Sequence, residues 1–458
     1  MDKSISEEPS YQPQVEESGS YSYSTSSKEK KEEQEEINES KLKQKQHNVI
    51  LYPRLKPVPF KESDLNSTIL PTLNKEIEIN GIEFFQSEDT PLNRRGFKYK
   101  LCRPNPTFSS NLYSTTEIEP FKITTSLFDR SGGILFNEDL STITTKQGWR
   151  STRTNVGIDE GSYYFEFKIL QANEKSHVRI GIGRKEASLE APVGFDGYGY
   201  GIRDVDGYLM SISRRKKQVI ENGFETGDVI GILIELPSLE EHRKMVKDFE
   251  DVKKEELKHQ KLKKRKMAKK KVDLEENIKF DEFGNIVRDQ IPIRYKNALY
   301  YEQYEYSSTK TMDHLLNPIS VVGEKAIIEM DDKTKNIPII ENSKITFYKN
   351  GVKQDEFTDL YSFLPTNVED NEDINLGPNI KQQQNPNYKN TNDGSLGYYP
   401  MLSSFQYGCV KLNPGPYFEY PVTHPVKPLS DRYDESIIEE WYWDLLDEVE
   451  AEYMDSFD

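Results

Sequence analysis

The sequence of 458 residues predicts an all-β fold, an antiparallel β-sandwich that carries long polar additions. Aromatic residues make up 11% of the chain, with 27 Tyr and 21 Phe, and such side chains favour the half-buried surface of a pleated sheet. Short segments of strand character follow one another, separated by Gly and Pro turns and without helical periodicity. Only 34% of the residues are hydrophobic and 30% are charged, so much of the chain must lie outside the core.

The N-terminal region is polar and almost free of aliphatic side chains. It contains SYSYSTSSKEKKEEQEE, which cannot bury enough apolar surface to offset the entropy lost on ordering. We therefore expect residues 1–47 to form a disordered tail. Residues 48–90 open with the Pro-punctuated VILYPRLKPVPF, which predicts an extended segment that lies against a folded domain.

The strand signals follow one another along the middle and later parts of the chain. SYYFEFKIL alternates with the period of a strand, placing Tyr163, Phe165, Phe167 and Ile169 on one face, and HVRIGIG repeats the pattern. Residues 228–236, DVIGILIEL, form a nearly continuous apolar run that suits a strand buried on both faces. Asn350-Gly351 predicts a hairpin because both turn positions need a positive φ. YPMLSSF and CVKLNPGPYFEYP close the series.

Two insertions interrupt the strand pattern. Residues 238–289 are charged throughout and rich in Glu, Lys, Leu and Met, which predicts a partly helical segment. Residues 366–396 contain NLGPNIKQQQNPNYKNTNDG, which predicts a disordered loop. A sandwich tolerates both at loop positions, because the entropy of loop closure grows slowly with length.

Residues 434–455 carry the pattern of an acidic amphipathic helix, which Asp434 caps. Carboxylates occupy the directions between its apolar positions. A helix of this length is marginal in water and needs an apolar groove, either on a partner or on its own sandwich. The apolar positions follow the i, i+4, i+8 pattern and are Ile437, Ile438, Trp441, Tyr442, Leu445, Leu446, Val449 and Tyr453.

A basic island lies within the first insertion. Lys258 to Lys271 holds nine Lys or Arg in fourteen positions and no acidic residue. It predicts a nuclear import signal, a contact with DNA phosphates, or a plain solvated helix face. The formal net charge of -17 disfavours a general affinity for nucleic acid. The core of the island is Lys261, Lys263, Lys264, Arg265, Lys266, Lys269, Lys270 and Lys271.

No constellation of catalytic or metal-binding residues stands out. The six histidines are isolated, and Cys102 and Cys409 are the only cysteines, which fits a reducing compartment. GFDGYGYGIRD does not fit a phosphate-binding glycine motif, and its glycines suit tight turns instead. No apolar run approaches the ~20 residues that span a bilayer. We expect a soluble protein, neither secreted nor an enzyme, with no metal, cofactor or membrane contact.

A specific resemblance emerges from the order GWRSTRTNVGIDEGSYYFEFKIL, VRIGIGRKEASLEAPVGFDGYGYGIRD, GFETGDVIGILIEL and ITFYKNGV. Over residues 91–428, outside the insertions, it resembles the SPRY domain of the trithorax-group subunit shared by COMPASS histone methyltransferases. GDVIG, FYKNG and YYFE occur in SPRY domains generally, whereas LEAPVGFDGYGYGIRD with the terminal helix resembles this subfamily, its fungal members most closely. The zinc finger and winged helix of the animal members have no counterpart here.

The resemblance implies a nuclear, non-catalytic scaffold that supports methylation of lysine four of histone H3 by a SET-domain subunit. It implies a basic pocket in which Arg153 and Arg179 bind an acidic segment of a WD-repeat subunit. By strand alternation, Arg179 points away from Val178 and Ile180, and both arginines are expected to be exposed. It also implies that the terminal helix docks into a small dimeric helical subunit through Ile438, Trp441, Tyr442, Leu445, Leu446 and Val449.

Two other interpretations of a SPRY-like sandwich stay open. A substrate receptor in ubiquitin ligation or a trafficking adaptor would use a peptide pocket built from sandwich loops and would not need the terminal helix. A hydrolase or lectin-like sandwich would bind sugars, which the aromatic content permits. The arginines are then ordinary surface charges, whose ion pairs are usually weak.

Overall fold

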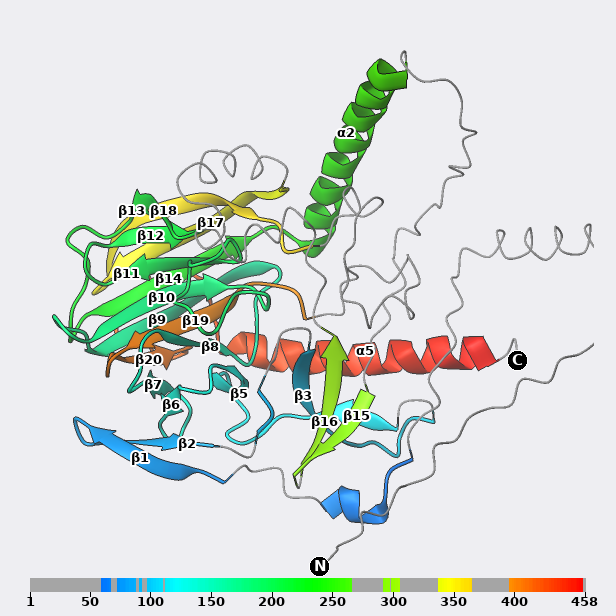
Figure 1. Ribbon diagram of the computed structural model, residues 1–458, viewed down its shortest axis with the longest axis horizontal. Coiled ribbons are helices and arrows are strands. Elements are labelled where there is room, and N and C mark those ends of the chain that lie inside the picture. Colours follow the sequence, from blue (N-terminus) through cyan, green and yellow to red (C-terminus); the bar gives the residue numbers. More distant parts are fainter. Residues whose placement is uncertain are drawn as a thin grey trace, which may run out of the picture. The chain divides into compact units, whose positions relative to one another are not determined.

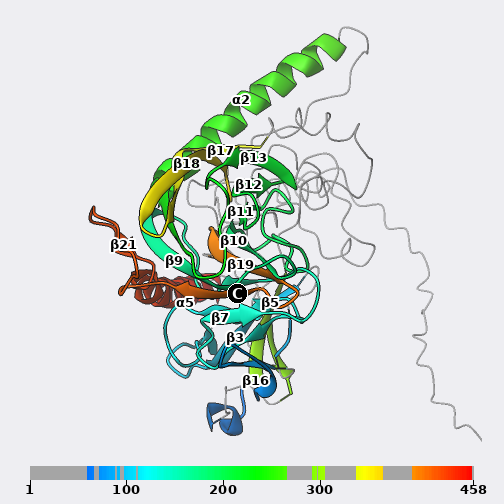
Figure 2. The same cartoon turned by 90° about the vertical axis from the view of Figure 1, so that its left-hand side faces the viewer.

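The computed structural model describes residues 59–66, 72–87, 90–92, 97–109, 112–265, 291–296, 298–304, 337–364 and 395–455. Its strands are predominantly antiparallel, which confirms the all-β prediction. Two large sheets form the sandwich, and Figure 2 shows β9 and β18 curving along one side of β10, β11 and β12. The predicted tail, residues 1–47, and the second insertion, residues 366–396 apart from 395 and 396, lie outside the described residues.

The larger sheet is ten-stranded and follows the order β1-β2-β6-β7-β20-β9-β14-β17-β18, with β21 paired to β9 in parallel. β9 and β14 lie at its centre, where Phe165 is paired with Ile232. The strands are β1 (Asn74–Ile79), β2 (Ile82–Gln86), β6 (Leu135–Phe136), β7 (Thr142–Thr144), β9 (Gly161–Gln171), β14 (Val229–Leu236), β17 (Ile339–Lys349), β18 (Val352–Tyr361), β20 (Cys409–Asn413) and β21 (Lys427–Pro428).

The second sheet is seven-stranded and follows the order β13-β12-β11-β10-β19-β8-β5. Ile180 of this sheet and Phe165 and Ile232 of the larger sheet are fully buried in one cluster, so the core lies between the two layers. The strands are β5 (Thr125–Arg130), β8 (Arg150–Thr154), β10 (His177–Gly183), β11 (Gly199–Arg203), β12 (Tyr208–Ser211), β13 (Arg214–Gln218) and β19 (Tyr399–Phe405).

A third, four-stranded sheet unites two segments from either side of the first insertion. It follows the order β15-β16-β3-β4, in which β3 (Phe97–Pro104) and β4 (Tyr113–Thr115) precede the sandwich core. β15 (Ile291–Tyr295) and β16 (Ala298–Tyr304) come after the insertion. Residues 91–428 therefore form more than a single sandwich. A short 3₁₀ helix, η1 (Glu62–Asn66), is tied to β15 by the Arg294–Asp64 ion pair.

β1 and β2 form a hairpin that the extended-segment prediction for residues 48–90 does not contain. Asn80 and Gly81 take φ values of 53° and 79° at its turn, and β2 pairs with β6 at the edge of the larger sheet. Asn350 and Gly351 take φ values of 49° and 79° between β17 and β18, which confirms that predicted hairpin. The two turns share the same sequence signal.

The outer face of β9 is covered as completely as its core face. The core face carries Phe165 and Phe167, as its alternation predicts. On the opposite face, Tyr164 packs against Phe418, with ring centroids 4.8 Å apart, and Glu166 accepts backbone hydrogen bonds at 2.8 Å from Glu419 and Tyr420. The segment between β20 and β21 thus lies along β9 and leads the chain into its last helix.

Two long helices flank the strands. α2 (Leu239–Arg265) begins with a capping box, in which Ser238 and Glu241 exchange side-chain to backbone hydrogen bonds, and its buried His242 donates to or accepts from Ser362 at 2.7 Å. It confirms the helical expectation for the first insertion. α5 (Asp431–Asp455) begins three residues before the predicted cap Asp434. In Figure 1, α5 is drawn in red and passes behind β3 and β16.

Candidate functional site

Arg153 is fully buried in the structure, with 1% of its surface exposed, so the expectation that it is exposed is wrong. Its guanidinium binds Asp129 through two hydrogen bonds of 2.7 Å. Nη1 donates to the carbonyls of Arg184 and Ala187 at 3.0 and 2.7 Å. The chain that follows β10 covers the arginine, and strand alternation carries no information about such a covering segment.

The partner of Arg153 is a buried carboxylate held in its charged form. Burial raises the pKa of Asp129, but the charges and hydrogen bonds of Arg153 and Lys185 outweigh burial and hold that pKa well below its usual range. Lys185 lies 3.1 Å from Asp129. These three groups form an internal network that uses four of the five N–H donors of Arg153.

Arg179 is half-buried on the outer face of the seven-stranded sheet, pointing away from the core as its strand alternation predicts. Its guanidinium carbon lies 5.2 Å from the centroid of the Trp149 ring, and one terminal nitrogen lies 3.5 Å from the Val193 carbonyl. Its Nε is buried and finds no hydrogen-bond acceptor among the described residues. Burial, then the charge of Arg203, lowers the pKa of Arg179 to about 10. Such an unsatisfied cation is suited to an incoming carboxylate.

An aromatic floor supports Arg179. Trp149 packs against Phe405 with ring centroids 5.4 Å apart, and Phe405 in turn lies 6.0 Å from the ring of His177. Trp149 lies just before β8, Phe405 ends β19 and His177 begins β10, and each is partly exposed. Neither Trp149 nor Arg203 is singled out by its sequence context, because only the pairing of strands brings them beside Arg179.

The second candidate surface is the outward face of α5. Ile438 is 66% exposed, and the other predicted docking residues are also exposed, apart from Leu445, which is half-buried. Large apolar side chains in this number seldom stay in water unless a partner covers them. The exposed members of the face are Ile437, Ile438, Trp441, Tyr442, Leu446 and Val449.

The polar face of α5 is turned towards the body of the protein. Lys100 of β3 forms an ion pair with Glu440, the backbone amide of Ser109 donates to Glu448 at 2.9 Å, and Asp444 is 4% exposed. This arrangement inverts the usual amphipathic helix, whose apolar face lies on the core. The described part of α5 therefore does not use its apolar stripe to pack on its own sandwich.

Arg432 anchors the first turns of α5. Its guanidinium binds Glu439 through two hydrogen bonds of 2.6 and 2.7 Å and Asp159 through a third of 3.0 Å, and its Nε donates to the Gly157 carbonyl. Nearby, Lys427 of β21 lies 2.7 Å from Glu435. These contacts set the direction in which the helix leaves the sandwich.

The basic island lies partly beyond what the structure describes. Lys261, Lys263, Lys264 and Arg265 fall in the last turns of α2. Lys266, Lys269, Lys270 and Lys271 lie outside the described residues. Their predicted roles in nuclear import or DNA contact therefore remain predictions.

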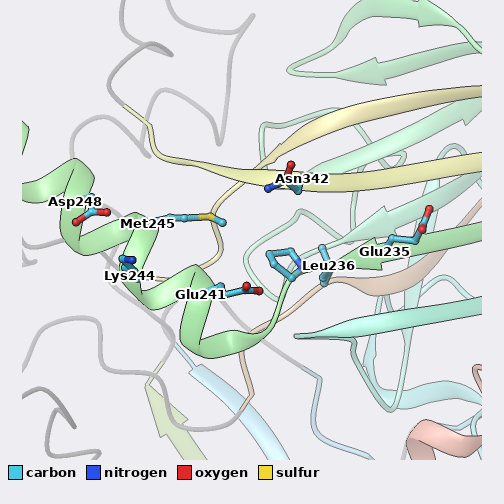
Figure 3. A pocket seen from close by; sticks show the side chains of 8 residues that line it. Glu235, Leu236, Glu241, Lys244, Met245, Asp248 and Asn342 are labelled. Atoms are coloured by element: carbon cyan, nitrogen blue, oxygen red, sulfur yellow. The ribbon is translucent and has the colours of Figure 1, made fainter.

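The described residues contain no grouping of three or more His, Cys, Asp or Glu that would hold a metal ion. An open groove of about 520 Å³ lies between the start of α2 and the sheet, and Figure 3 shows Glu241, Met245 and Asp248 of the helix along one side of it. Its lining mixes charges of both signs with apolar groups and places no nucleophile beside a base. None of the helices in the described ranges is long and apolar enough to cross a membrane.

Comparisons with known proteins agree with this architecture. The SPRY domain family model matches residues 162–240. "COMPASS component cclA" of Colletotrichum higginsianum is 32% identical, covering 81% of this chain and 69% of that protein. "Set1 complex component ash2" of Schizosaccharomyces pombe is 32% identical over 89% of this chain and 53% of its own length. "COMPASS component BRE2" of Saccharomyces cerevisiae is 30% identical over 82% and 91%.

Proposed function

Because this chain belongs to the family of the COMPASS components, we propose that it is a non-catalytic scaffold subunit of a COMPASS-type complex that methylates lysine four of histone H3. The observation that carries the proposal is the similarity to three fungal components over four-fifths or more of the chain. Two surfaces support a role in holding other subunits together: the Arg179 bed, which consists of Arg179, Trp149 and Phe405, and the outward face of α5.

The Arg179 bed receives an acidic segment of a WD-repeat subunit. The planar guanidinium can bind a carboxylate through two parallel hydrogen bonds, and no acidic residue among the described residues forms an ion pair with it. Arg153 has an indirect, structural role. Its hydrogen bonds to Asp129 and to the Arg184 carbonyl hold β8 and the segment after β10 in place beside the Arg179 bed. In this proposal only Arg179 of the two arginines touches the partner.

The outward face of α5 docks into the apolar groove of a small dimeric helical subunit. Burying a large apolar side chain is worth roughly 1.5–3 kcal/mol, so a few such anchors are enough for stable association. Trp441, Tyr442 and Val449 are all more than half exposed and are available to enter such a groove. The inward polar contacts of α5 support this, because they hold the apolar face away from the protein's own body.

The bridged subunits support the SET-domain catalyst by binding its active conformation more tightly than its inactive ones. A ligand shifts a conformational equilibrium only through such a difference in affinity. The SET-domain subunit then carries out the methylation. This chain acts in the nucleus, where the histone substrate of the complex is found.

The test is methyltransferase activity in a complex reconstituted from the SET-domain, WD-repeat and helical-dimer subunits, with and without the full chain. We expect the chain to stimulate methylation of histone H3 and the Arg179→Glu variant to stimulate it much less. Lys411→Glu reverses an exposed charge on the other sheet and serves as the matched control. Equal stimulation by wild type and Arg179→Glu would contradict the Arg179 site, and no stimulation by the wild type would contradict the scaffold role.

A further inference from the structure

Arg179 and Arg203 occupy directly opposed positions on the antiparallel strands β10 and β11. Opposed residues share one face of a sheet and bring their Cβ atoms to about 4.5–5.5 Å, where two like charges destabilise the pair. Arg203 accordingly lowers the pKa of Arg179, second only to burial. A sheet that keeps two cations in this position gains stability when an anion lies between them.

The row of cations continues beyond Arg203. Asp206 lies 3.2 Å from Arg203 and 3.0 Å from Arg215, so one carboxylate serves two guanidinium groups. Arg215 also stacks on Tyr208, 4.8 Å from its ring centroid, and is more than half exposed. Within the part of the chain that the structure describes, Arg179 has no ion pair of its own. Asp206 pairs with Arg203 and Arg215, while Arg179 feels the charges of Asp204 and Asp206 without an ion pair to either among the described residues.

We propose that the acidic segment bound at Arg179 continues across Arg203 to Arg215, and that Asp206 occupies the place of one ligand carboxylate. Arg203 is then the second arginine of the pocket, in place of the buried Arg153. The inference rests on the proposed function, since it extends the same Arg179 site along β11 and towards β13. A ligand carboxylate bridges Arg179 and Arg203, and the next one competes with Asp206.

Charge and surroundings favour an acidic peptide over nucleic acid. Duplex DNA brings one phosphate charge per about 1.7 Å, which sets a dense row of anions against Asp206 and against Glu190, which lies 3.2 Å from Arg150. A peptide can space its carboxylates to meet the arginines only. The partly exposed Trp149 and Phe405 beside Arg179 also provide an apolar floor for the side chains between them.

The experiment measures the affinity of the full chain for a short fluorescein-labelled peptide rich in Glu and Asp, by fluorescence anisotropy at low ionic strength. Arg203→Ala should weaken binding about tenfold, which corresponds to one charge-assisted hydrogen bond. Arg203→Lys keeps the charge but loses the planar fork, so a smaller loss is expected. Lys411→Ala removes one positive charge from the other sheet and should leave the affinity within about twofold of wild type.

Asp206→Asn provides the opposite test, because it should increase the affinity. Removing the internal carboxylate frees Arg203 and Arg215, and we expect binding about twofold to fivefold tighter than wild type, within the range of one exposed ion pair. An unchanged or lower affinity would overturn the role given to Asp206. The thermal midpoint of each variant is measured alongside, and Arg203→Lys keeps the test decisive if Arg203→Ala does not fold.

The failures of the two proposals give different results. Loss of binding in Arg179→Ala with no change in Arg203→Ala or Asp206→Asn would overturn this inference alone. No change in Arg179→Ala would overturn the acidic-segment site itself. Duplex DNA that displaces the peptide at equal charge concentration, and that binds less tightly to Arg203→Ala, would assign the row of arginines to nucleic acid and overturn the peptide.

Discussion

Arg153 and Arg179 stand on β8 and β10 of one sheet, on either side of β19, and their physical situations are opposite. Arg153 satisfies four donors inside the protein, whereas Arg179 keeps a buried Nε without an acceptor among the described residues. The residue type alone cannot separate them, because both stand in strands at positions compatible with an outward direction. The difference arises from the segment after β10, which covers one guanidinium and leaves the other at the surface.

Arg153→Ala should cost about 3–5 kcal/mol of unfolding free energy, because it strands Asp129 in the interior beside a single lysine. The measurement is urea-induced unfolding followed by tryptophan fluorescence. Arg179→Ala is the matched control in the same sheet, and its smaller cost should stay below about 1 kcal/mol. Equal costs for the two variants would contradict the assignment of one arginine to stability and the other to binding.

At the level of elements, the inverted helix α5 is the clearest departure from a usual globular pattern. Its alternation of apolar and acidic positions is visible in the sequence, but two outcomes fit that pattern equally. Either the apolar or the acidic face of the helix can contact the body of the protein. Which face does so depends on the side chains that the body presents to the helix. Lys100, Ser109 and the Arg432 anchor select the acidic face, and the apolar stripe is left outward.

The two Asn-Gly hairpins allow backbone strain and packing to be separated. Gly81 and Gly351 both have a φ of +79°, but an added Cβ meets nothing within 4 Å at Gly81 and lies 3.0 Å from the Tyr420 ring at Gly351. Gly81→Ala should therefore cost about 1–2 kcal/mol from the left-handed conformation alone. Gly351→Ala should cost more, and comparison of the two unfolding free energies checks this. A cheaper Gly351→Ala would contradict the close packing of Tyr420.

At the level of the whole molecule, the two binding surfaces lie on separate elements. The Arg179 bed belongs to β10 and the strand ends beside it, and the docking face belongs to α5. A scaffold of this kind can hold two partners at once without competition between them.

Independence of the surfaces predicts additive effects. In the reconstituted complex, Arg179→Ala should weaken binding of the WD-repeat subunit and Val449→Ala that of the helical dimer. The double variant should lose the sum of the two binding free energies to within about 0.5 kcal/mol. Isothermal titration of each partner in the presence and absence of the other provides the measurement. A large coupling energy would show that the partners touch each other or share a surface.

Local patterns in the sequence determined the strand-rich architecture, the Asn350-Gly351 hairpin, the helix of the first insertion and the amphipathic terminal helix. Alternation, turn chemistry and helical spacing act between neighbours, so they can be read from the chain directly. The Asn80-Gly81 hairpin carries the same readable signal, within a segment whose prolines favour an extended chain.

Only the tertiary structure decided which arginine is buried, which face of α5 points outward, and that Arg203 stands opposite Arg179. Strand register and loop covering bring together residues that are distant in the chain, and no local pattern encodes them. The same holds for the sheet that joins β3 to β16 across the first insertion. Binding surfaces in this protein depend on those long-range choices, because an arginine or an apolar stripe becomes a site only where the fold leaves it uncovered.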